Sequence, residues 1–398
     1  MTRSQWSTVL VGTIVSLIAL SVSAALPPKR PANVCIESGG DCPTTPEPAA
    51  GDGIKWHPGH YVYLDDPLAI ENLSERRNRH FSVIDSLDAV PAVKGINIHI
   101  YWAVLEGPTA GDYASGFEVI DSYLQELESL KTPRRLMLVI NERLFGEYDP
   151  SRIDSILPAY LFTSAYNGGY VTGADGSGGL SLSARIWEKP TMDRLIALSQ
   201  ALAKRYDNHP LFEMVGFQET TFGLPGSGFN LAAYHAQLNR WFDASKKAWA
   251  HTQLRLNANF GGSDATMRAL IDHSIIGGVV AIGGPDPELP LPSITRRIQA
   301  NQVFRGDTGG GRDLRGVVAW VGEQQGLGLG RRYTQTPELL FDYQYNTMRA
   351  NYMIWQHNDY LGGDEQKWDT GILPFIRSIN GKIRTECPTA YRNRCVTD

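Results

Sequence analysis

Short apolar runs alternate along the chain with segments of helical periodicity, from about residue 54 to the C-terminus. Apolar runs of about four to eight residues bounded by turn-forming or polar residues are typical of buried strands. Eight such runs predict strands at His60–Leu64, Gly95–Tyr101, Arg135–Ile140, Met214–Phe217, Leu254–Asn259, Gly278–Ile282, Gly316–Val321 and Tyr352–Gln356. Helices are predicted at Glu118–Leu130, Thr191–Tyr206, Leu231–Ala250, Asp264–Ser274, Ser293–Phe304 and Pro337–Asn346.

This alternation predicts an α/β fold, and eight successive β units fit a (β/α)₈ TIM barrel. A doubly wound sheet is the competing architecture. It would normally carry a glycine-rich nucleotide fingerprint after its first strand, and the sequence has none there. The barrel is therefore the predicted fold.

The two ends of the chain differ from its body. Arg3, a charge-free apolar run from Thr8 to Leu26 and the small residues at 22–25 are typical of a secretory signal peptide, with a retained membrane anchor as the alternative. We predict a signal peptide over 1–25, a Pro-rich arm or linker over 26–52, the catalytic barrel over 53–384 and a disulfide-bearing tail over 385–398. The chain is then secreted or periplasmic, with no stable membrane insertion after cleavage.

The four cysteines lie near the two ends of the sequence, at Cys35, Cys42, Cys387 and Cys395. This distribution suits an oxidising compartment. It fits two short clips, 35–42 and 387–395, or two bridges that join the ends. Neither spacing suggests a zinc site.

The net charge of −5 and the absence of a basic run give no indication of a nucleic-acid partner. The 9 Trp and 17 Tyr residues fill cores in most proteins, but several of these stand at predicted strand ends, where flat rings can stack on sugars. The polar residues that follow the predicted strands are carboxylates and amides. Because the carboxyl ends of barrel strands carry the chemistry, a carbohydrate is the predicted substrate.

Two glutamates end predicted strands four and seven. Glu219 follows the run from Phe212 to Gln218, and Glu323 follows the run from Val317 to Gly322. Glycoside hydrolysis needs one carboxylic acid to protonate the leaving oxygen and one carboxylate to attack the anomeric carbon or to activate water. A glutamate fixed by a salt bridge on the barrel rim is the alternative for either residue alone.

In these positions the sequence resembles the clan A glycoside hydrolases, a superfamily of retaining TIM-barrel glycosidases. The segment Ile98–Glu106, followed by Gly-Asp-Tyr at 111–113, is similar to the second-strand segment of that clan, and Tyr352–Gln356 resembles its eighth strand. The resemblance spans residues 54–380 as a pattern of positions and points to no single family. It implies Glu219 as acid/base and Glu323 as nucleophile. One departure is Gln218, where clan members usually carry Asn.

The segment 160–187 has little periodicity and is either disordered or a cleft wall. We further predict substrate contacts from aromatic, amide and other polar residues in this segment and at strand ends. Those residues are Trp102, Asn141, Tyr170, Glu188, Gln218, Asn257, Trp355 and His357. His60 and His99 are interpreted as ordinary barrel-interior residues.

Other chemistries lack their motifs. The histidines do not form an HExxH or comparable metal-binding spacing, the glycine runs are not phosphate loops, and no G-x-S-x-G segment follows a strand. We therefore predict a cofactor-independent retaining glycosidase acting on a β-linked polysaccharide or oligosaccharide. The alternatives are a non-catalytic polysaccharide-binding barrel and an inverting hydrolase or transglycosylase that uses the same carboxylates.

Overall fold

The computed structural model describes residues 53–64, 67–145, 149, 152–174, 180–217, 219–220, 228–258, 263–283, 313–324, 336–357 and 367–397. Asp264, Glu323 and Gln324 are described by their backbone alone. The predicted signal peptide and linker, Cys35, Cys42, Gln218 and the predicted helix Ser293–Phe304 lie outside these residues. No helix in the described part of the chain is long and apolar enough to span a membrane.

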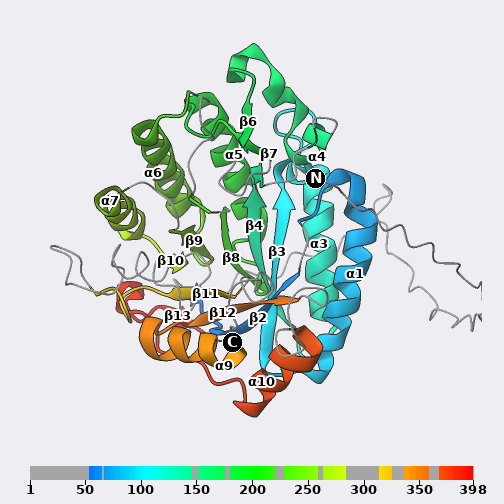
Figure 1. The fold of residues 1–398 in the computed structure, drawn as a ribbon, viewed down its shortest axis with the longest axis vertical. Helices are drawn as coiled ribbons and strands as arrows, with labels where there is room; N and C mark the ends of the chain where they lie inside the picture. The colour runs from blue at the N-terminus through cyan, green and yellow to red at the C-terminus, as the bar shows by residue number, and fades with distance from the viewer. Residues whose placement is uncertain are drawn as a thin grey trace, which may run out of the picture. The chain divides into compact units, whose positions relative to one another are not determined.

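A closed barrel of eight parallel strands forms the centre of the fold (Figure 1). Around the barrel the strands follow chain order, and β12 closes against β2. Their bounds are β2 (Gly59–Leu64), β3 (Val93–Tyr101), β4 (Arg135–Asn141), β8 (Phe212–Phe217), β9 (Gln253–Asn257), β10 (Val280–Gly283), β11 (Trp320–Gln324) and β12 (Tyr352–His357). The predicted (β/α)₈ barrel is confirmed. The seventh strand was predicted at Gly316–Val321. The observed strand begins four residues later, at Trp320, and includes Glu323.

Helices cover the outside of the barrel, and α1 and α3 pack side by side in Figure 1. Their bounds are α1 (Leu73–Ser86), α2 (Trp102–Leu105), α3 (Ala114–Ser129), α5 (Lys189–Tyr206), α6 (Leu231–Ala248), α7 (Asp264–Ile275), α9 (Pro337–Asp342), which continues into a π-helical turn over Tyr343–Met348, and α10 (Leu373–Ser378). In α5 a proline stands in the first turn, and Leu195, Leu198 and Leu202 form a buried stripe, as the periodicity predicts. Helix α1 was not predicted, because only His80 and Ile84 of its fourteen residues are buried.

Alternation along the strands separates two cores. Val62, Ile98 and Val215 face outward into the layer beneath the helices, whereas Tyr61, Met214 and Ile354 fill the barrel interior. A register shift between β4 and β8 sets Met137 opposite Met214 and leaves Glu213 unpaired along the strand. Such a bulge lets two successive residues point to one side of a sheet. Glu213 therefore joins the interior.

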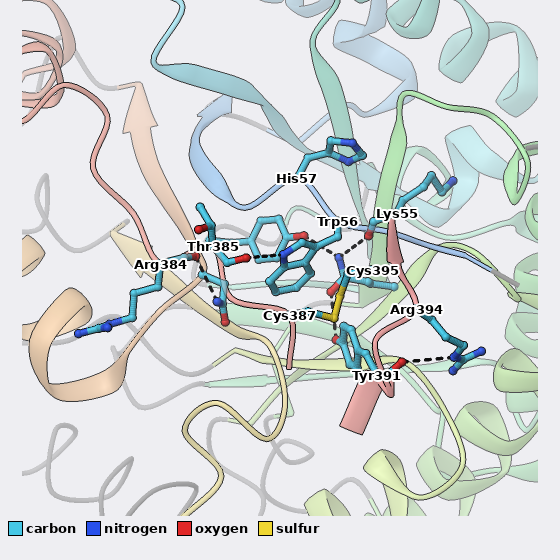
Figure 2. Close-up of a disulfide and its surroundings, with 12 residues drawn as sticks. Lys55, Trp56, His57, Arg384, Thr385, Cys387, Tyr391, Arg394 and Cys395 are labelled. Carbon is cyan, nitrogen blue, oxygen red and sulfur yellow. Dashed lines mark hydrogen bonds between the residues drawn. A yellow bond between two sulfur atoms is a disulfide. The ribbon is translucent and has the colours of Figure 1, made fainter. Parts of the chain in front are cut away.

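Residues near the C-terminus pack against the interior core at the amino-terminal end of the barrel, around the disulfide drawn in Figure 2. Strand β13 (Cys395–Val396) pairs in parallel with β1 (Ile54–Lys55), and a disulfide joins Cys387 to Cys395. The short clip at 387–395 is therefore confirmed for this pair, and bridges from these cysteines to Cys35 or Cys42 are excluded. Tyr391, which lies between the two cysteines, packs edge-on against Trp56 at a centroid distance of 5.8 Å.

A small antiparallel sheet follows β4, in the region predicted to lack periodicity. In sheet order it contains β5 (Arg143–Leu144), β7 (Leu180–Ala184) and β6 (Tyr170–Ala174). A short helix, α4 (Ile153–Ile156), lies between β5 and β6 in the chain. The arrowheads of β3 and β4 point toward this sheet in Figure 1. The described part of the segment is thus ordered and rises from the carboxyl ends of the strands.

Candidate active site

Polar side chains occupy the inward positions at the carboxyl ends of the barrel strands. Alternation with outward-facing leucine, isoleucine and valine side chains directs them into the barrel. They are Tyr63 on β2, His99 on β3, Asn141 on β4, Asn257 on β9 and Gln356 on β12. The predicted contacts Asn141 and Asn257 therefore lie at the same end of the barrel, on strands separated by β8.

Glu219 lies two residues beyond the end of β8 and is half-buried. The next residue, Thr220, donates hydrogen bonds from its backbone N and its Oγ1 to the carbonyl oxygen of Asn257, at 3.1 and 2.9 Å. These bonds fix the segment that carries Glu219 to the end of β9. The glutamate therefore lies at the carboxyl end of the barrel, on the fourth strand in barrel order.

Glu323 belongs to β11, the seventh strand, and its backbone is paired with Ile354 of β12. It lies two residues after Val321, a member of the interior core. The strand numbers predicted for both glutamates agree with the observed strand order. The side chain of Glu323, and with it the separation of the two carboxyl groups, lies outside the described residues.

A buried ion pair lies directly after β4. Glu142, directly after β4, accepts hydrogen bonds through Oε1 from Arg143 Nε at 2.7 Å and Nη2 at 2.5 Å. Burial opposes the charge on Arg143, but Glu142 and Tyr234 raise its pKa above the ordinary value. Burial raises the pKa of the Tyr234 hydroxyl to about 12, Arg143 lowers it, and the charges of Glu142 and Glu219 raise it. Both carboxylates therefore act on the same phenol.

A second polar layer lies deeper in the barrel. Arg255 of β9 reaches toward β3 and donates from Nη1 to Oδ1 of Asn97 at 3.3 Å. Gly216 lets β8 approach Arg255 closely, since a Cβ at that position would lie 2.6 Å from the Arg255 carbonyl oxygen. His99 is two residues further along β3 than Asn97, and its ring centroid lies 4.6 Å from that of Tyr63. Arg255 and Asn97 therefore lie beneath the strand-end residues, and His99 lies directly above them.

Three other predicted contacts lie on β6, at the start of α5 and at the end of β12. Tyr170, on β6, is half-buried and packs edge-on against Phe162 at 5.4 Å. Glu188 is half-buried and precedes α5 as its N-cap residue. His357 ends β12, and its ring centroid is 5.9 Å from that of Trp368.

The two tryptophans predicted to stack on sugar occupy other positions. Trp355 alternates with the interior residue Ile354, so it points outward, where its Nε1 donates to Nδ1 of His60 at 2.9 Å. Trp102 lies on α2 and donates from Nε1 to Oε2 of Glu106 at 2.8 Å. Both side chains have 0% exposed area. The stacking prediction is corrected for both, because both rings pack in the core beneath the helices and both indole N–H groups are paired within it. For the same reason His60 is a residue of the outer layer, while His99 does lie in the interior.

Sequence reasoning missed the Glu142–Arg143 pair and the interior position of Arg255. Alternation with the outward-facing Leu254 and Leu256 identifies Arg255 as inward-facing, and this signal was available in the sequence. The contact between Arg143 and Tyr234 joins β5 to α6, and no local pattern predicts it. Within the described residues no group of His, Cys, Asp or Glu side chains could hold a metal ion.

No protein-family profile and no curated protein sequence matches this chain. Solved structures do match. The chain is similar to an exo-β-1,4-mannosidase from Opitutaceae bacterium strain TAV5, with a TM-score of 0.50 and 13% identity over 86% of this chain. It spans only 63% of the length of that mannosidase. It is also similar to the catalytic domain of a β-amylase from Paenibacillus polymyxa, with a TM-score of 0.54 and 9% identity, covering 84% of this chain and 100% of the other.

A third match is the GH5_18 enzyme from Streptomyces cattleya, solved in complex with GlcNAc, with a TM-score of 0.52 and 12% identity, covering 84% of this chain and 82% of the other. At such identities these likenesses establish the fold. The chain is a (β/α)₈ barrel similar in fold to these solved glycosidases, without assignment to one family.

Proposed function

We propose that the chain is a retaining glycoside hydrolase in which Glu219 is the acid/base and Glu323 the nucleophile. The observation that carries the proposal is their placement: one glutamate follows strand four and the other belongs to strand seven of a closed barrel. The similarity in fold to solved glycosidases supports glycosidase activity in general.

The proposed reaction is a double displacement. Glu219 donates a proton to the glycosidic oxygen while the Glu323 carboxylate attacks the anomeric carbon, so that the leaving group departs and a glycosyl-enzyme forms. Glu219, now ionised, takes a proton from water, and the water attacks the same carbon and releases Glu323. Two inversions leave the anomeric configuration unchanged.

The proposed substrate is a β-linked oligosaccharide or polysaccharide. Amide side chains such as Asn141 and Asn257 offer both donors and acceptors to hydroxyl groups. The names of the matched structures, a β-1,4-mannosidase and a GlcNAc complex, agree with a carbohydrate ligand. A signal peptide over 1–25 would carry the enzyme to the periplasm or the medium, where such polymers occur.

The test is a panel of aryl glycosides and polysaccharides assayed with the wild-type chain and with Glu219→Gln and Glu323→Gln. Both variants are expected to lose at least about a thousandfold in kcat on every substrate that the wild type cleaves. Glu75→Gln is the matched control, because Glu75 is an exposed residue of α1 whose side chain is 77% exposed. Activity that survives in both catalytic variants refutes the assignment.

Two further outcomes separate the alternatives. A wild-type chain that binds a polysaccharide but releases no product is a non-catalytic binding barrel. If product is released, NMR of the newly formed reducing end distinguishes retention from inversion. Initial release of the inverted anomer contradicts the double displacement and leaves the two carboxylates with the roles of an inverting enzyme.

A further inference from the structure

Two buried side chains at the carboxyl end of the barrel have no hydrogen-bond partner. His99 is 6% exposed and Asn141 is 1% exposed. Both ring nitrogens of His99 and both amide atoms of Asn141 lack a hydrogen bond. Within the described residues, these are the two side chains with two buried polar atoms that are both unpaired.

His99 is uncharged in this environment. Burial, together with the positive charge of Arg255, lowers the pKa of His99 to about 3. A neutral imidazole carries one N–H donor and one acceptor nitrogen, and a primary amide likewise both donates and accepts. The two side chains therefore present a set of donors and acceptors without net charge.

The positions of these residues connect them to the proposed catalytic segment. His99 is paired with Val139 in the β3–β4 ladder, and Val139 is paired with Gly216 in the β4–β8 ladder. Asn141 follows Ile140, whose partner on β8 is Phe217. Glu219 lies two residues beyond Phe217. The unpaired atoms thus lie in the barrel mouth on the two strands that precede the Glu219 strand.

An unpaired polar group in a protein interior costs about 1–3 kcal/mol, and native structures contain few of them. Unpaired atoms also occur in the layer beneath the helices, but as single atoms, such as Nε1 of Trp241 and Oγ1 of Thr191. At the barrel mouth single unpaired atoms occur too, such as Oε1 of Gln356, but His99 and Asn141 each present a complete donor–acceptor set. A hydroxyl group both donates and accepts, so it matches each set.

We propose that His99 and Asn141 bind ring hydroxyls of an uncharged sugar and select the substrate of this site. This inference rests on the proposed carbohydrate specificity and extends it to a residue, His99, that the sequence pattern had assigned to ordinary packing. Each side chain donates one hydrogen bond to a sugar hydroxyl and accepts one from a sugar hydroxyl, and neither side chain changes its charge.

The test measures binding separately from cleavage. The full chain carrying Glu219→Gln is titrated with the methyl β-glycosides of glucose, mannose, galactose and N-acetylglucosamine, and with their monodeoxy analogues, by ligand-observed NMR. We expect His99→Phe and Asn141→Leu to weaken the binding of the preferred glycoside roughly tenfold each, the loss of one buried hydrogen bond or slightly more. His99→Gln, which keeps a donor and an acceptor, is expected to bind more tightly than His99→Phe. One monodeoxy analogue is expected to bind the parent chain and His99→Phe equally.

His60→Phe is the matched control. His60 is also buried and has a pKa lowered to about 4 by burial, but it lies in the outer layer and both of its nitrogens are paired, to Trp355 and to the Lys382 carbonyl. We expect His60→Phe to lower the Tm without changing the dissociation constant. His99→Phe is expected to keep or raise the Tm, because it removes two unpaired buried atoms.

Three results overturn the inference: unchanged sugar binding in both His99→Phe and Asn141→Leu, a Tm loss in His99→Phe equal to that in His60→Phe, or no binding of any glycoside in the panel. Sugar binding that depends on His99 in a chain that cleaves nothing refutes the proposed hydrolysis and keeps the inference. If the chain cleaves a glycoside but its sugar binding is unchanged in both variants, the inference is refuted and the proposed hydrolysis is kept.

Discussion

Tyr352 of β12 donates a hydrogen bond from its hydroxyl to Oε1 of Glu213 on β8, at 2.7 Å, inside the amino-terminal end of the barrel. Glu213 also accepts from the backbone N of His57 at 2.9 Å and contacts His57 Nδ1 at 2.8 Å. The carboxylate is fully buried, and its hydrogen bond with Tyr352 links β8 to β12, which lie on opposite sides of the barrel. It is the centre of a polar network in the half of the barrel that lies away from the candidate site.

Glu213→Gln should make stability less dependent on pH in acid. Burial opposes ionisation of Glu213, but the hydrogen bonds and charge of His57 and the neighbouring Arg135 hold the pKa of its carboxyl below the ordinary value of 4.5. The stabilisation by this group is therefore complete above pH 4.5 and is lost as the pH falls from 4.5 through the folded-state pKa. Urea unfolding at pH 3 to 7 should show the wild type losing more stability than the variant below pH 4.5. Parallel curves would contradict the assigned role.

Replacing both Cys387 and Cys395 with Ser should loosen the same end of the barrel. The disulfide closes a short loop, with a sequence separation of 8, and holds Tyr391, whose hydroxyl donates to Oε1 of Gln253 at 3.0 Å (Figure 2). Loop closure of this size contributes about 2–3 kcal/mol. We expect a lower Tm with unchanged KM, since Tyr391 belongs to the amino-terminal end. A Tm equal to that of the wild type would contradict a stabilising clip.

Thr220→Val should lower kcat by several-fold and leave the Tm nearly unchanged. The hydroxyl of Thr220 is one of two donors that fix the Glu219 segment to the carbonyl of Asn257. Misplacement of an acid/base group by a fraction of an ångström is expected to slow proton transfer more than binding. Thr220→Ser keeps the donor and should restore kcat. If Ser and Val behave alike, the hydrogen bond does not position Glu219.

Trp355→Phe should destabilise the protein by about 1–3 kcal/mol without weakening sugar binding. The substitution removes the donor to His60 and part of a side chain with 0% exposed area. Chemical unfolding and the sugar titration described above measure the two effects separately. Lost sugar binding at an unchanged free energy of unfolding would restore Trp355 to the site and contradict its outward orientation.

The sequence predicts the barrel well because each strand is a short apolar run with clear boundaries. It predicts the strand numbers of Glu219 and Glu323 for the same reason, since the strands follow chain order around the barrel. Trp355 lies near the end of its strand, as the prediction required, but alternation puts it on the opposite face from the interior residue Ile354.

Other features could not be predicted from local patterns. Helix α1 has five charged residues among its fourteen and only two buried residues, so its apolar stripe is weak. The unpaired state of His99 and Asn141 depends on which side chains meet inside the closed barrel. The Glu213 network depends likewise on a bulge in β8 and on contacts with residues more than a hundred positions away.

The central claim is that a sugar becomes covalently attached to Glu323 during turnover. Incubation of the wild-type chain with a 2-deoxy-2-fluoro glycoside of the preferred sugar, followed by intact-mass and peptide-mapping mass spectrometry, tests this directly. The account predicts one glycosyl adduct per chain, located on Glu323, and no adduct in Glu323→Gln. An adduct on another residue, or hydrolysis of the parent substrate with no adduct at any time, would contradict the proposed mechanism.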